Sequence, residues 1–338
     1  MAEHFLSLST ADRTELLLAA GSRLGRPAYL LEKDLWVVWT LNELFTSPIG
    51  KHLRFKGGTS LSKAYRLIDR FSEDVDLTYD IRQILGTDTE QQLPSSRSEA
   101  RRWSAQVRAR LPDWVGGVVQ ATLSTSLARE EINATLIQDD DRLYLYYPVL
   151  TSANTYVQPR IMLEFGARSC GEPYSCCPIS CDIGPAAEGI MFPEATPLVM
   201  DVARTFWEKA TAAHVYCRQN RLKGERFARH WHDLAAIGAS AHLDQILQKF
   251  EIANLVADHK SWFFRERTAQ GTWVNYHEAV TGQLHIIPEG DARSVLEDDY
   301  ERMLEGGMFD NQPISFNDLM ERCSSLENRL NASAATRG

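Results

Sequence analysis

The 338-residue sequence contains no long apolar run. No stretch approaches the roughly 18 consecutive apolar residues that a membrane-spanning helix requires. The opening residues, MAEHFLSLSTADR, also lack a basic segment followed by an apolar core, which is the pattern of a secretory leader. Internal repeats and low-complexity segments are missing as well. We therefore expect a cytoplasmic protein with no membrane partner, and its 44% hydrophobic residues are enough for the cores of two domains.

An excess of positive charge is also missing, because the formal net charge is −9. This composition argues against a protein that coats nucleic acid without sequence preference, since that behaviour needs an extensive positive field. Two local basic clusters are nevertheless present. The first, which reads equally well as a solvated face, comprises Arg97, Arg101, Arg102, Arg108 and Arg110. The second comprises Arg218, Arg221, Lys223, Arg226 and Arg229.

The six cysteines lack the paired C-x2-C spacing of zinc knuckles. Four of them fall between Cys170 and Cys181 with the spacing C-x5-C-C-x3-C. The adjacent pair Cys176 and Cys177 is poorly placed to bind one tetrahedral ion. We therefore expect structural or incidental thiols, as is usual in the cytosol.

The stretch from Phe55 to Tyr79, FKGGTSLSKAYRLIDRFSEDVDLTY, reads as a strand, a Gly-Gly turn, a helix and a second strand. The apolar residues that define the first strand and the helix are Leu53, Phe55, Leu61, Tyr65 and Ile68. Without a Cβ atom, Gly57 and Gly58 allow backbone N–H groups to approach a phosphate, and the helix presents its positive dipole end to that anion. Thr59 and Ser60 add hydroxyl groups nearby. The pattern predicts a phosphate-binding turn.

The second strand carries two carboxylates on one face. Because side chains alternate across a strand, Ser72, Asp74, Asp76 and Thr78 are expected on one face, and Val75 and Leu77 on the other. Asp74 and Asp76 would repel each other unless cations lie between them, and such oxygen ligands suit Mg²⁺. An isolated D-x-D more often marks a solvated edge strand, but the phosphate-binding turn directly upstream favours a metal site for phosphoryl-type transfer.

The sequences K-G-G-T-S-L-S-K and R-F-S-E-D-V-D-L in this stretch closely resemble the AbiEii/AbiGii toxin family, which includes the MenT toxins and has the polymerase-β-like nucleotidyltransferase fold. Further similar stretches are E-K-D-L-W-V-V-W at Glu32–Trp39, L-E-F-G-A-R at Leu163–Arg168, F-W-E-K-A at Phe206–Ala210 and R-H-W-H-D-L at Arg229–Leu234, followed by S-F-N-D-L-M and L-E-N-R-L-N near Ser315–Asn331. Together they cover most of the chain in the family's order.

The resemblance implies an α+β fold. A nucleotidyltransferase domain with a mixed β-sheet and flanking helices would span residues 1–195, and a mainly helical domain carrying Lys209 and Asp233 would span 196–338. Residue patterns predict helices over 10–21, capped by Thr10, and over 27–45, 99–111, 198–217 and 225–238. They also predict strands over 118–127, 142–149 and 156–166.

The resemblance also implies an enzyme that uses Mg²⁺ and an NTP substrate. Its catalytic residues would be Asp74, Asp76, Lys209 and Asp233, and its nucleotide-binding residues Lys56, Gly57, Gly58, Thr59, Ser72 and Lys209. Enzymes of this fold commonly take a third metal-directed carboxylate from a neighbouring strand, and Glu164 is the candidate beside Asp74 and Asp76. Lys33 and Asp34, polar residues in an apolar run, either form an intrahelical charge cluster or line the cleft.

The implied function is that of a toxin in a toxin–antitoxin or abortive-infection system, hence in phage defence. It would transfer NMP from NTP to the 3′ end of a transfer RNA, held by the second basic cluster, and so block translation and growth. The partner antitoxin would be a DNA-binding repressor or a kinase that phosphorylates Ser72. Two alternatives stay open: a metal-dependent phosphohydrolase using His232 and Asp233 with His214 or His242, and a catalytically silent nucleotide-binding module.

Overall fold

The computed structural model describes residues 3–86, 91, 93–152, 157–220, 226–306, 309 and 312–335. The chain divides into two compact units. The first unit contains Met1–Ala64, Phe71–Gln92 and Trp103–Met200, and the second contains Tyr65–Arg70, Leu93–Arg102 and Asp201–Gly338. Each unit is therefore assembled from segments that are not continuous in the sequence.

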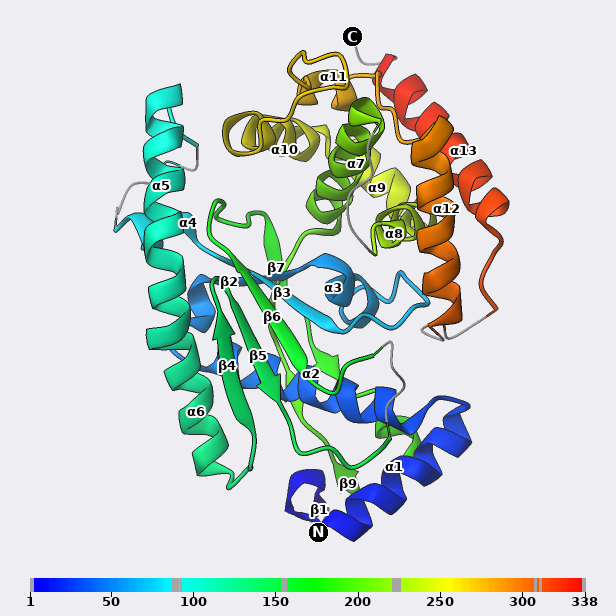
Figure 1. Ribbon diagram of the computed structural model, residues 1–338. Helices are drawn as coiled ribbons and strands as arrows, with labels where there is room; N and C mark the ends of the chain where they lie inside the picture. The colour runs from blue at the N-terminus through cyan, green and yellow to red at the C-terminus, as the bar shows by residue number, and fades with distance from the viewer. Residues whose placement is uncertain are drawn as a thin grey trace. The chain divides into compact units, whose positions relative to one another are not determined.

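A seven-stranded mixed sheet forms the centre of the first unit (Figure 1). Its strands are β2 (Leu53–Lys56), β3 (Asp74–Tyr79), β4 (Thr135–Asp139), β5 (Arg142–Tyr146), β6 (Ile161–Gly166), β7 (Tyr174–Cys176) and β11 (Leu198–Met200). They lie in the order β4-β5-β6-β3-β2-β11-β7. The pairs β3/β6 and β2/β11 are parallel and the other neighbours are antiparallel. In β6 Ile161, Leu163 and Phe165 are buried and alternate with more exposed residues, as the sequence predicts.

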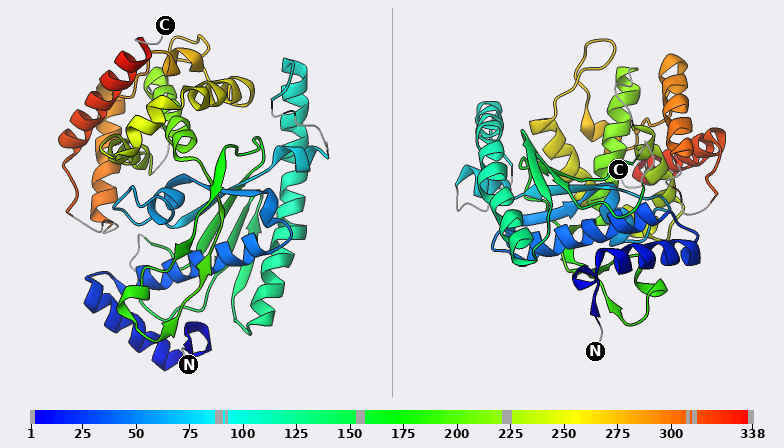
Figure 2. Two further views of the ribbon diagram at one scale, coloured as in Figure 1. Left: turned by 180° about the vertical axis from the view of Figure 1, so that it is seen from behind. Right: turned by 60° about the horizontal axis from the view of Figure 1, so that its bottom comes forward.

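The first unit also contains the helices α1 (Thr10–Leu24), α2 (Ala28–Thr46), α3 (Gly57–Lys63) and α4 (Ile81–Leu85), with short turns η1 (Phe5–Ser7), η2 (Gly50–His52) and η4 (Gly184–Ala186). Of these helices, α2 and α3 pack on this sheet and α1 packs on α2 (Figure 2). Two small sheets pair β1 (Glu3–His4) with β9 (Ile190–Met191), and β8 (Ile179–Ser180) with β10 (Glu194–Ala195). The predicted cap of α1 is wrong, because the side chain of Ser9, not Thr10, accepts the first-turn N–H bond, from Asp12.

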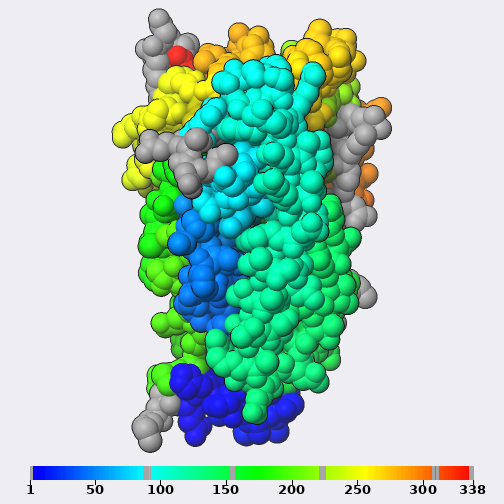
Figure 3. All heavy atoms as spheres, turned by 90° about the vertical axis from the view of Figure 1, so that its left-hand side faces the viewer, coloured from blue at the N-terminus to red at the C-terminus, as the bar shows by residue number. Residues whose placement is uncertain are grey.

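A long helical run follows α4, and its exposed side is visible in Figure 3. It comprises α5 (Arg97–Trp114), a π-helical turn η3 (Val115–Val119) and α6 (Gln120–Arg129). The prediction of a strand over 118–127 is wrong. The β-branched residues suggested a strand, but Val115, Val119, Leu123 and Leu127 recur every four residues and are all buried, which is a helical stripe.

The second unit is helical in its described part. It contains α7 (Val202–Gln219), α8 (Ala228–Gly238), α9 (His242–Gln248), α10 (Phe250–Phe263), α11 (Tyr276–Val280), α12 (Gly290–Glu305) and α13 (Phe316–Ala335). The helix predicted from 198 begins only at Val202, because Leu198–Met200 extends the sheet as β11 beside β2. Phe206, Trp231 and Leu234 are fully or almost fully buried in this unit.

The α+β class is confirmed, with the mixed sheet in the N-terminal part and the helical unit in the C-terminal part. Among the described residues no helix is both long enough and apolar enough to cross a membrane.

Candidate functional site

The phosphate-binding turn predicted at Gly57 connects β2 directly to α3. Gly57 has φ +77°, a conformation that residues with a Cβ rarely adopt, and a Cβ built there would lie 2.0 Å from Oδ2 of Asp76. The turn and the D-x-D strand are therefore in direct contact. The predicted continuation of the helix through Tyr65 and Ile68 is wrong, because α3 ends at Lys63 and the next residues join the second unit.

A row of four charged residues crosses the sheet at Asp76. Lys56 on β2 pairs in register with Asp76 on β3, Asp76 with Glu164 on β6, and Glu164 with Arg142 on β5. Arg142 lies 3.1 Å from a carboxylate oxygen of Glu164, and this neighbour raises the pKa of the Arg142 guanidinium. The row thus places two carboxylates between two cations. The expected neighbourhood of Glu164 and the D-x-D strand is present.

Asp74 is the first residue of β3, two residues before Asp76, and its backbone carbonyl contacts Thr59. The hydroxyl of Thr59 contacts the carbonyl oxygen of Asp74 and donates to Ser72 Oγ at 2.9 Å. Ser72 itself precedes the strand, which begins at Asp74, so its predicted place on the strand face is wrong. It is 8% exposed and lies beside the turn through Thr59 rather than through strand alternation.

The carboxylates suit Mg²⁺, which commonly takes one or two protein carboxylates and completes its shell with water and substrate phosphates. Asp74 and Asp76 provide this pair on β3. In the described part of the chain no group of three or more His, Cys, Asp or Glu side chains converges to hold a metal ion. The structure thus fits a two-carboxylate site. The role of Glu164, which is paired with Arg142, stays a prediction.

A buried ion-pair network supports both ends of this motif. Lys33 Nζ lies 2.6 Å from Glu73, the residue before β3, and donates to the carbonyl of Gln158 at 2.7 Å. Lys33 and Glu73 are almost completely buried. The two readings of Lys33 were an intrahelical cluster and a cleft residue, and the structure shows neither. It shows a tie between α2 and the segment that enters the D-x-D strand.

The neighbouring acid on α2 holds the other end of the motif. Asp34 lies 2.6 Å from Nζ of Lys63, the last residue of α3, which also contacts Asp182 at 2.8 Å. Burial, together with Asp182, raises the pKa of Asp34 despite the ammonium of Lys63. Asp182 is also buried, but Lys63 and Arg26 outweigh that effect and lower its pKa. The partners in this network are not specified by the sequence, whose signal is three charged residues, Glu32, Lys33 and Asp34, within an apolar helix.

In the second unit Asp233 is fully buried and held by two cations. Arg70 donates to it through Nε and Nη2, both at 2.8 Å, and Lys209 Nζ lies 3.0 Å away. Burial alone would raise the pKa of Asp233, but Arg70 and Lys209 hold it well below its usual range. Lys209 is therefore a paired, nearly buried lysine rather than a solvated one. Arg70 was not predicted, although it stands four residues before Asp74.

Two histidines of the phosphohydrolase alternative, His232 and His214, already have protein partners. His232 lies 3.4 Å from Asp69 and 3.6 Å from Asp233, and although burial opposes it, hydrogen bonding to these acids raises its pKa. Nδ1 of His214 accepts from the backbone of His285 at 3.0 Å, and burial lowers the pKa of His214 to about 4. Asp233 is taken by Arg70 and Lys209, so these contacts do not favour a histidine–aspartate metal dyad.

The predicted RNA-binding cluster is described only in part, because Arg221 and Lys223 lie outside the described residues. Arg218 is exposed near the end of α7. Arg226, which has φ +71°, donates its backbone N–H to Asp299 at 2.7 Å. Arg229 lies in the first turn of α8. RNA binding by this cluster stays a prediction.

The fold and the charge row define an α+β protein with a phosphate-binding turn against a pair of carboxylates. A family model described as nucleotidyl transferase AbiEii toxin of type IV toxin–antitoxin systems matches residues 39–322. The chain therefore belongs to the AbiEii nucleotidyltransferase toxin family. The turn, the D-x-D pair, Lys209 and Asp233 all lie within the matched range.

Among solved structures, the chain is similar to the MenT4 nucleotidyltransferase toxin of Mycobacterium tuberculosis H37Rv, with 17% identity and a TM-score of 0.49 over 97% of this chain and 90% of that one. It is also similar to JHP933 of Helicobacter pylori, with 15% identity and a TM-score of 0.43 over 91% of this chain and 94% of that one. No curated protein matches the sequence significantly.

Proposed function

We propose that this toxin transfers a nucleoside monophosphate from an NTP to RNA, at the 3′ end of a transfer RNA, with release of pyrophosphate, in a reaction that depends on Mg²⁺. Family membership supports the nucleotidyltransferase class. The observation that carries the proposal is the contact between Gly57 and Asp76, because it brings a turn suited to phosphate against a carboxylate pair suited to the metal.

Each residue of the first unit has a role that follows from its position. Backbone N–H groups at Gly57 and Gly58 would bind the triphosphate, with Lys56 as a nearby cation and Thr59 fixing the entry to β3. Asp74 and Asp76 would hold Mg²⁺ as a pair, and Glu164, beside Asp76 in register and paired with Arg142, would add negative charge next to the metal. The bound metal would neutralise charge that develops on the transferred phosphoryl group.

The family resemblance brings Lys209 and Asp233 into the same reaction. A lysine suits a phosphate as a point charge on a flexible stem. Asp233 keeps the ammonium of Lys209 in place, and Arg70 in turn holds Asp233 by two parallel hydrogen bonds. We therefore propose Lys209 as a phosphate-binding residue and Asp233 as its positioning residue.

The test is to incubate the protein with each of the four NTPs, labelled at the α-phosphate, together with Mg²⁺ and total RNA. The proposal expects label on RNA of transfer-RNA size, at its 3′ end. Labelled NDP or NMP without labelled RNA would instead indicate the phosphohydrolase. Nucleotide binding without either product would indicate the silent binding module.

We further propose that a cognate antitoxin controls the toxin, either as a DNA-binding repressor or as a kinase that modifies Ser72. A phosphoryl group on Ser72 would add roughly two negative charges next to Thr59 and the carboxylate pair, so repulsion would exclude NTP. Ser72 is 8% exposed, so a kinase would need the segment before β3 to open locally.

This control by charge predicts that Ser72→Glu is inactive in transfer and harmless on induced expression, whereas wild type arrests growth. Ser72→Ala should keep the fold and lose part of the activity, because Thr59 loses a hydroxyl partner. The measurements are growth curves and label transfer. A Ser72→Glu variant that is as toxic as wild type would remove Ser72 from the site.

A further inference from the structure

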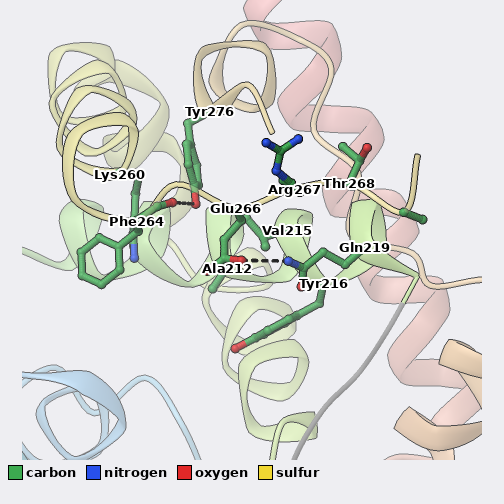
Figure 4. Close-up of a pocket in the computed structure, with 11 residues that line it drawn as sticks. Ala212, Val215, Tyr216, Gln219, Lys260, Phe264, Glu266, Arg267, Thr268 and Tyr276 are labelled. Carbon is green, nitrogen blue, oxygen red and sulfur yellow. Dashed lines mark hydrogen bonds between the residues drawn. The ribbon is translucent and has the colours of Figure 1, made fainter. Parts of the chain in front are cut away.

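The second unit contains a cavity of about 560 Å³, a volume in the range of ligand-binding pockets, that the proposed function does not use (Figure 4). Its walls include Tyr216 and Gln219 of α7, Phe264 at the end of α10, Glu266 and Arg267 of the following loop, and Tyr276 of α11. Aromatic rings and polar groups thus share one enclosure.

The interior chemistry suits a planar, uncharged, hydrogen-bonding group. Gln219 donates its amide N–H to the carboxylate of Glu266 at 3.0 Å, and Figure 4 shows this pair beside the ring of Tyr216. A carboxylate repels phosphate but accepts hydrogen bonds from an exocyclic amino group, as it does with cytosine. A nucleobase meets these conditions, because it stacks on aromatic rings and can donate to the carboxylate.

Cations paired with aromatic rings lie in the segment from Lys260 to Trp273, part of which lines this cavity. The guanidinium groups of Arg265 and Arg267 lie 3.8 and 4.1 Å from the ring centroid of Trp273, which is 47% exposed. Lys260 lies 4.7 Å from the ring of Phe264. Such contacts occur roughly once per 70–80 residues in proteins, so three between Lys260 and Trp273 are a marked concentration.

A second basic segment of the chain, at the start of α5, packs against α10. Arg97, at the start of α5, lies 4.7 Å from the ring of Trp262 and donates to the carbonyl of Ser261 at 2.6 Å. Arg101, one helical turn later, lies on the same face of α5. The carbonyl of Arg218 accepts a hydrogen bond from Ala269 at 3.0 Å, so the predicted basic cluster adjoins the same loop. Basic side chains are thus numerous on these segments, with Asp258, Glu266 and Glu278 among the acids there.

We propose that this cavity and its cationic surface bind a single-stranded segment of the acceptor RNA, with one base in the cavity and backbone phosphates on Arg265 and Arg267. This inference rests on the proposed RNA acceptor and adds the place where the RNA is held. An acidic peptide would also meet the cations, but the interleaved rings and the Gln219–Glu266 pair inside the cavity favour a nucleic acid strand.

The test measures binding of a fluorescent single-stranded RNA of about 12 nucleotides, a length within the usual site size, without NTP. Arg265→Gln/Arg267→Gln should weaken binding roughly tenfold and reduce the salt slope by about 1.4, or about 0.7 for each lost phosphate contact. Trp273→Ala should weaken binding by roughly fivefold or more through lost stacking and support of the two guanidiniums.

Matched controls come from exposed residues of the same unit. Arg302→Gln/Arg329→Gln removes the same charge from side chains that are 56% and 52% exposed, and Val295→Ala truncates an apolar side chain that is 42% exposed. Both should leave affinity within about twofold, because neither touches the cavity or its cationic surface. Equal RNA affinity and salt slope in the Arg265→Gln/Arg267→Gln variant and in this charge control would overturn the proposal.

Two further arms identify the occupant. A labelled mononucleotide should bind far more weakly than the RNA at this surface, and equal loss of mononucleotide and RNA binding in Trp273→Ala would show a small-nucleotide site instead. Binding of a poly-glutamate peptide that competes with the RNA would point to an acidic protein partner. The binding assay contains no NTP and is therefore independent of the labelling assay. RNA binding that depends on Arg265 and Arg267, together with no labelled RNA when NTP and Mg²⁺ are supplied, would refute the proposed reaction and leave this site standing.

Discussion

At the scale of single residues, the site depends on how closely Gly57 approaches Asp76. The turn has φ +77° and leaves no space for a Cβ, so glycine serves two needs there: a left-handed backbone and an undisturbed carboxylate. A substitution would have to move the carboxyl group of Asp76, which belongs to the proposed metal pair. Geometry of the backbone and chemistry of the site are therefore coupled at this residue.

This coupling is tested by Gly57→Ala against Gly25→Ala. Gly25 has φ +66° with no neighbouring atom within 4 Å of an added Cβ, so its substitution reports backbone strain alone, about 1–2 kcal/mol. Gly57→Ala should cost more and should lower transfer by an amount that stability does not explain. The measurements are urea unfolding and label transfer. Equal unfolding free energies with intact transfer in both variants would contradict the steric account.

Asp233 gives a residue-scale prediction about pH. Its folded-state pKa lies well below the usual range. Its ion pairing therefore stabilises the fold fully at pH values above the ordinary aspartate pKa of about 3.9, and this stabilisation is lost as the pH falls through the folded-state pKa. Arg70→Met should therefore lower the free energy of unfolding by about 3 kcal/mol or more at pH 7, and the difference from wild type should narrow below about pH 4.

The control for Arg70→Met is Arg329→Met, which breaks an exposed pair with Asp244 and should cost less than about 1 kcal/mol. Chemical denaturation from pH 7 to pH 3 measures both. If the difference in unfolding free energy between wild type and Arg70→Met stayed constant across this range, the titration of Asp233 would not contribute to it, which would contradict this account.

At the scale of elements, α2 acts as a support for the motif. Its consecutive residues Glu32, Lys33 and Asp34 contact three separate segments: the backbone at Leu150 and Thr151, Glu73 before β3, and Lys63 at the end of α3. The end of α3 and the entry to the D-x-D strand are thereby tied to one helix. A buried charge pair is costly to break, because the partner that remains stays buried without compensation.

Lys33→Met should therefore destabilise the first unit by about 3–5 kcal/mol, since Glu73 would stay buried without its ammonium partner. The double variant Lys33→Met/Glu73→Leu should recover part of this loss, because both charges are then absent. Unfolding free energies of the two single variants and the double variant complete the cycle. A loss below about 1 kcal/mol in Lys33→Met would show that the pair does not support the motif.

The sequence predicts best the strands whose apolar residues alternate regularly with polar ones. Val75 and Leu77 on β3, and Ile161, Leu163 and Phe165 on β6, alternate as predicted, and the sheet neighbourhood of Glu164 follows from them. The segment over 118–127 was assigned wrongly because its β-branched residues outweighed a four-residue period that is plain once burial is known.

The parts that could not be predicted are pairings between distant residues. Arg70 and Asp233 are 163 residues apart, and Lys33 and Glu73 are 40 apart. Nothing in the local pattern of either residue specifies its partner, because a charged side chain in an apolar run shows only that some partner exists. These pairings come from tertiary packing, and they are the contacts that hold the candidate site residues in place.

At the scale of the whole molecule, the chain returns twice to each unit. Residues 65–70 leave the first unit between α3 and β3, and residues 93–102 belong to the second unit before α5 continues in the first. The motif stretch that identifies the family thus contributes Gly57, Asp74 and Asp76 to one unit and Arg70 to the other. The family match over residues 39–322 spans both units, so the proposed activity belongs to the chain as a whole.

The most direct test of the account is label transfer from NTP to RNA by Asp74→Asn and Asp76→Asn, with Asp139→Asn, an exposed residue of the same sheet, as the matched control. Transfer should fall about 100-fold or more in the two site variants, a loss typical of a removed transition-state contact, and stay near wild type in the control. Their stability without metal should hold or rise, because like-charge repulsion is relieved. Near wild-type transfer in either Asp74→Asn or Asp76→Asn would contradict the two-carboxylate site.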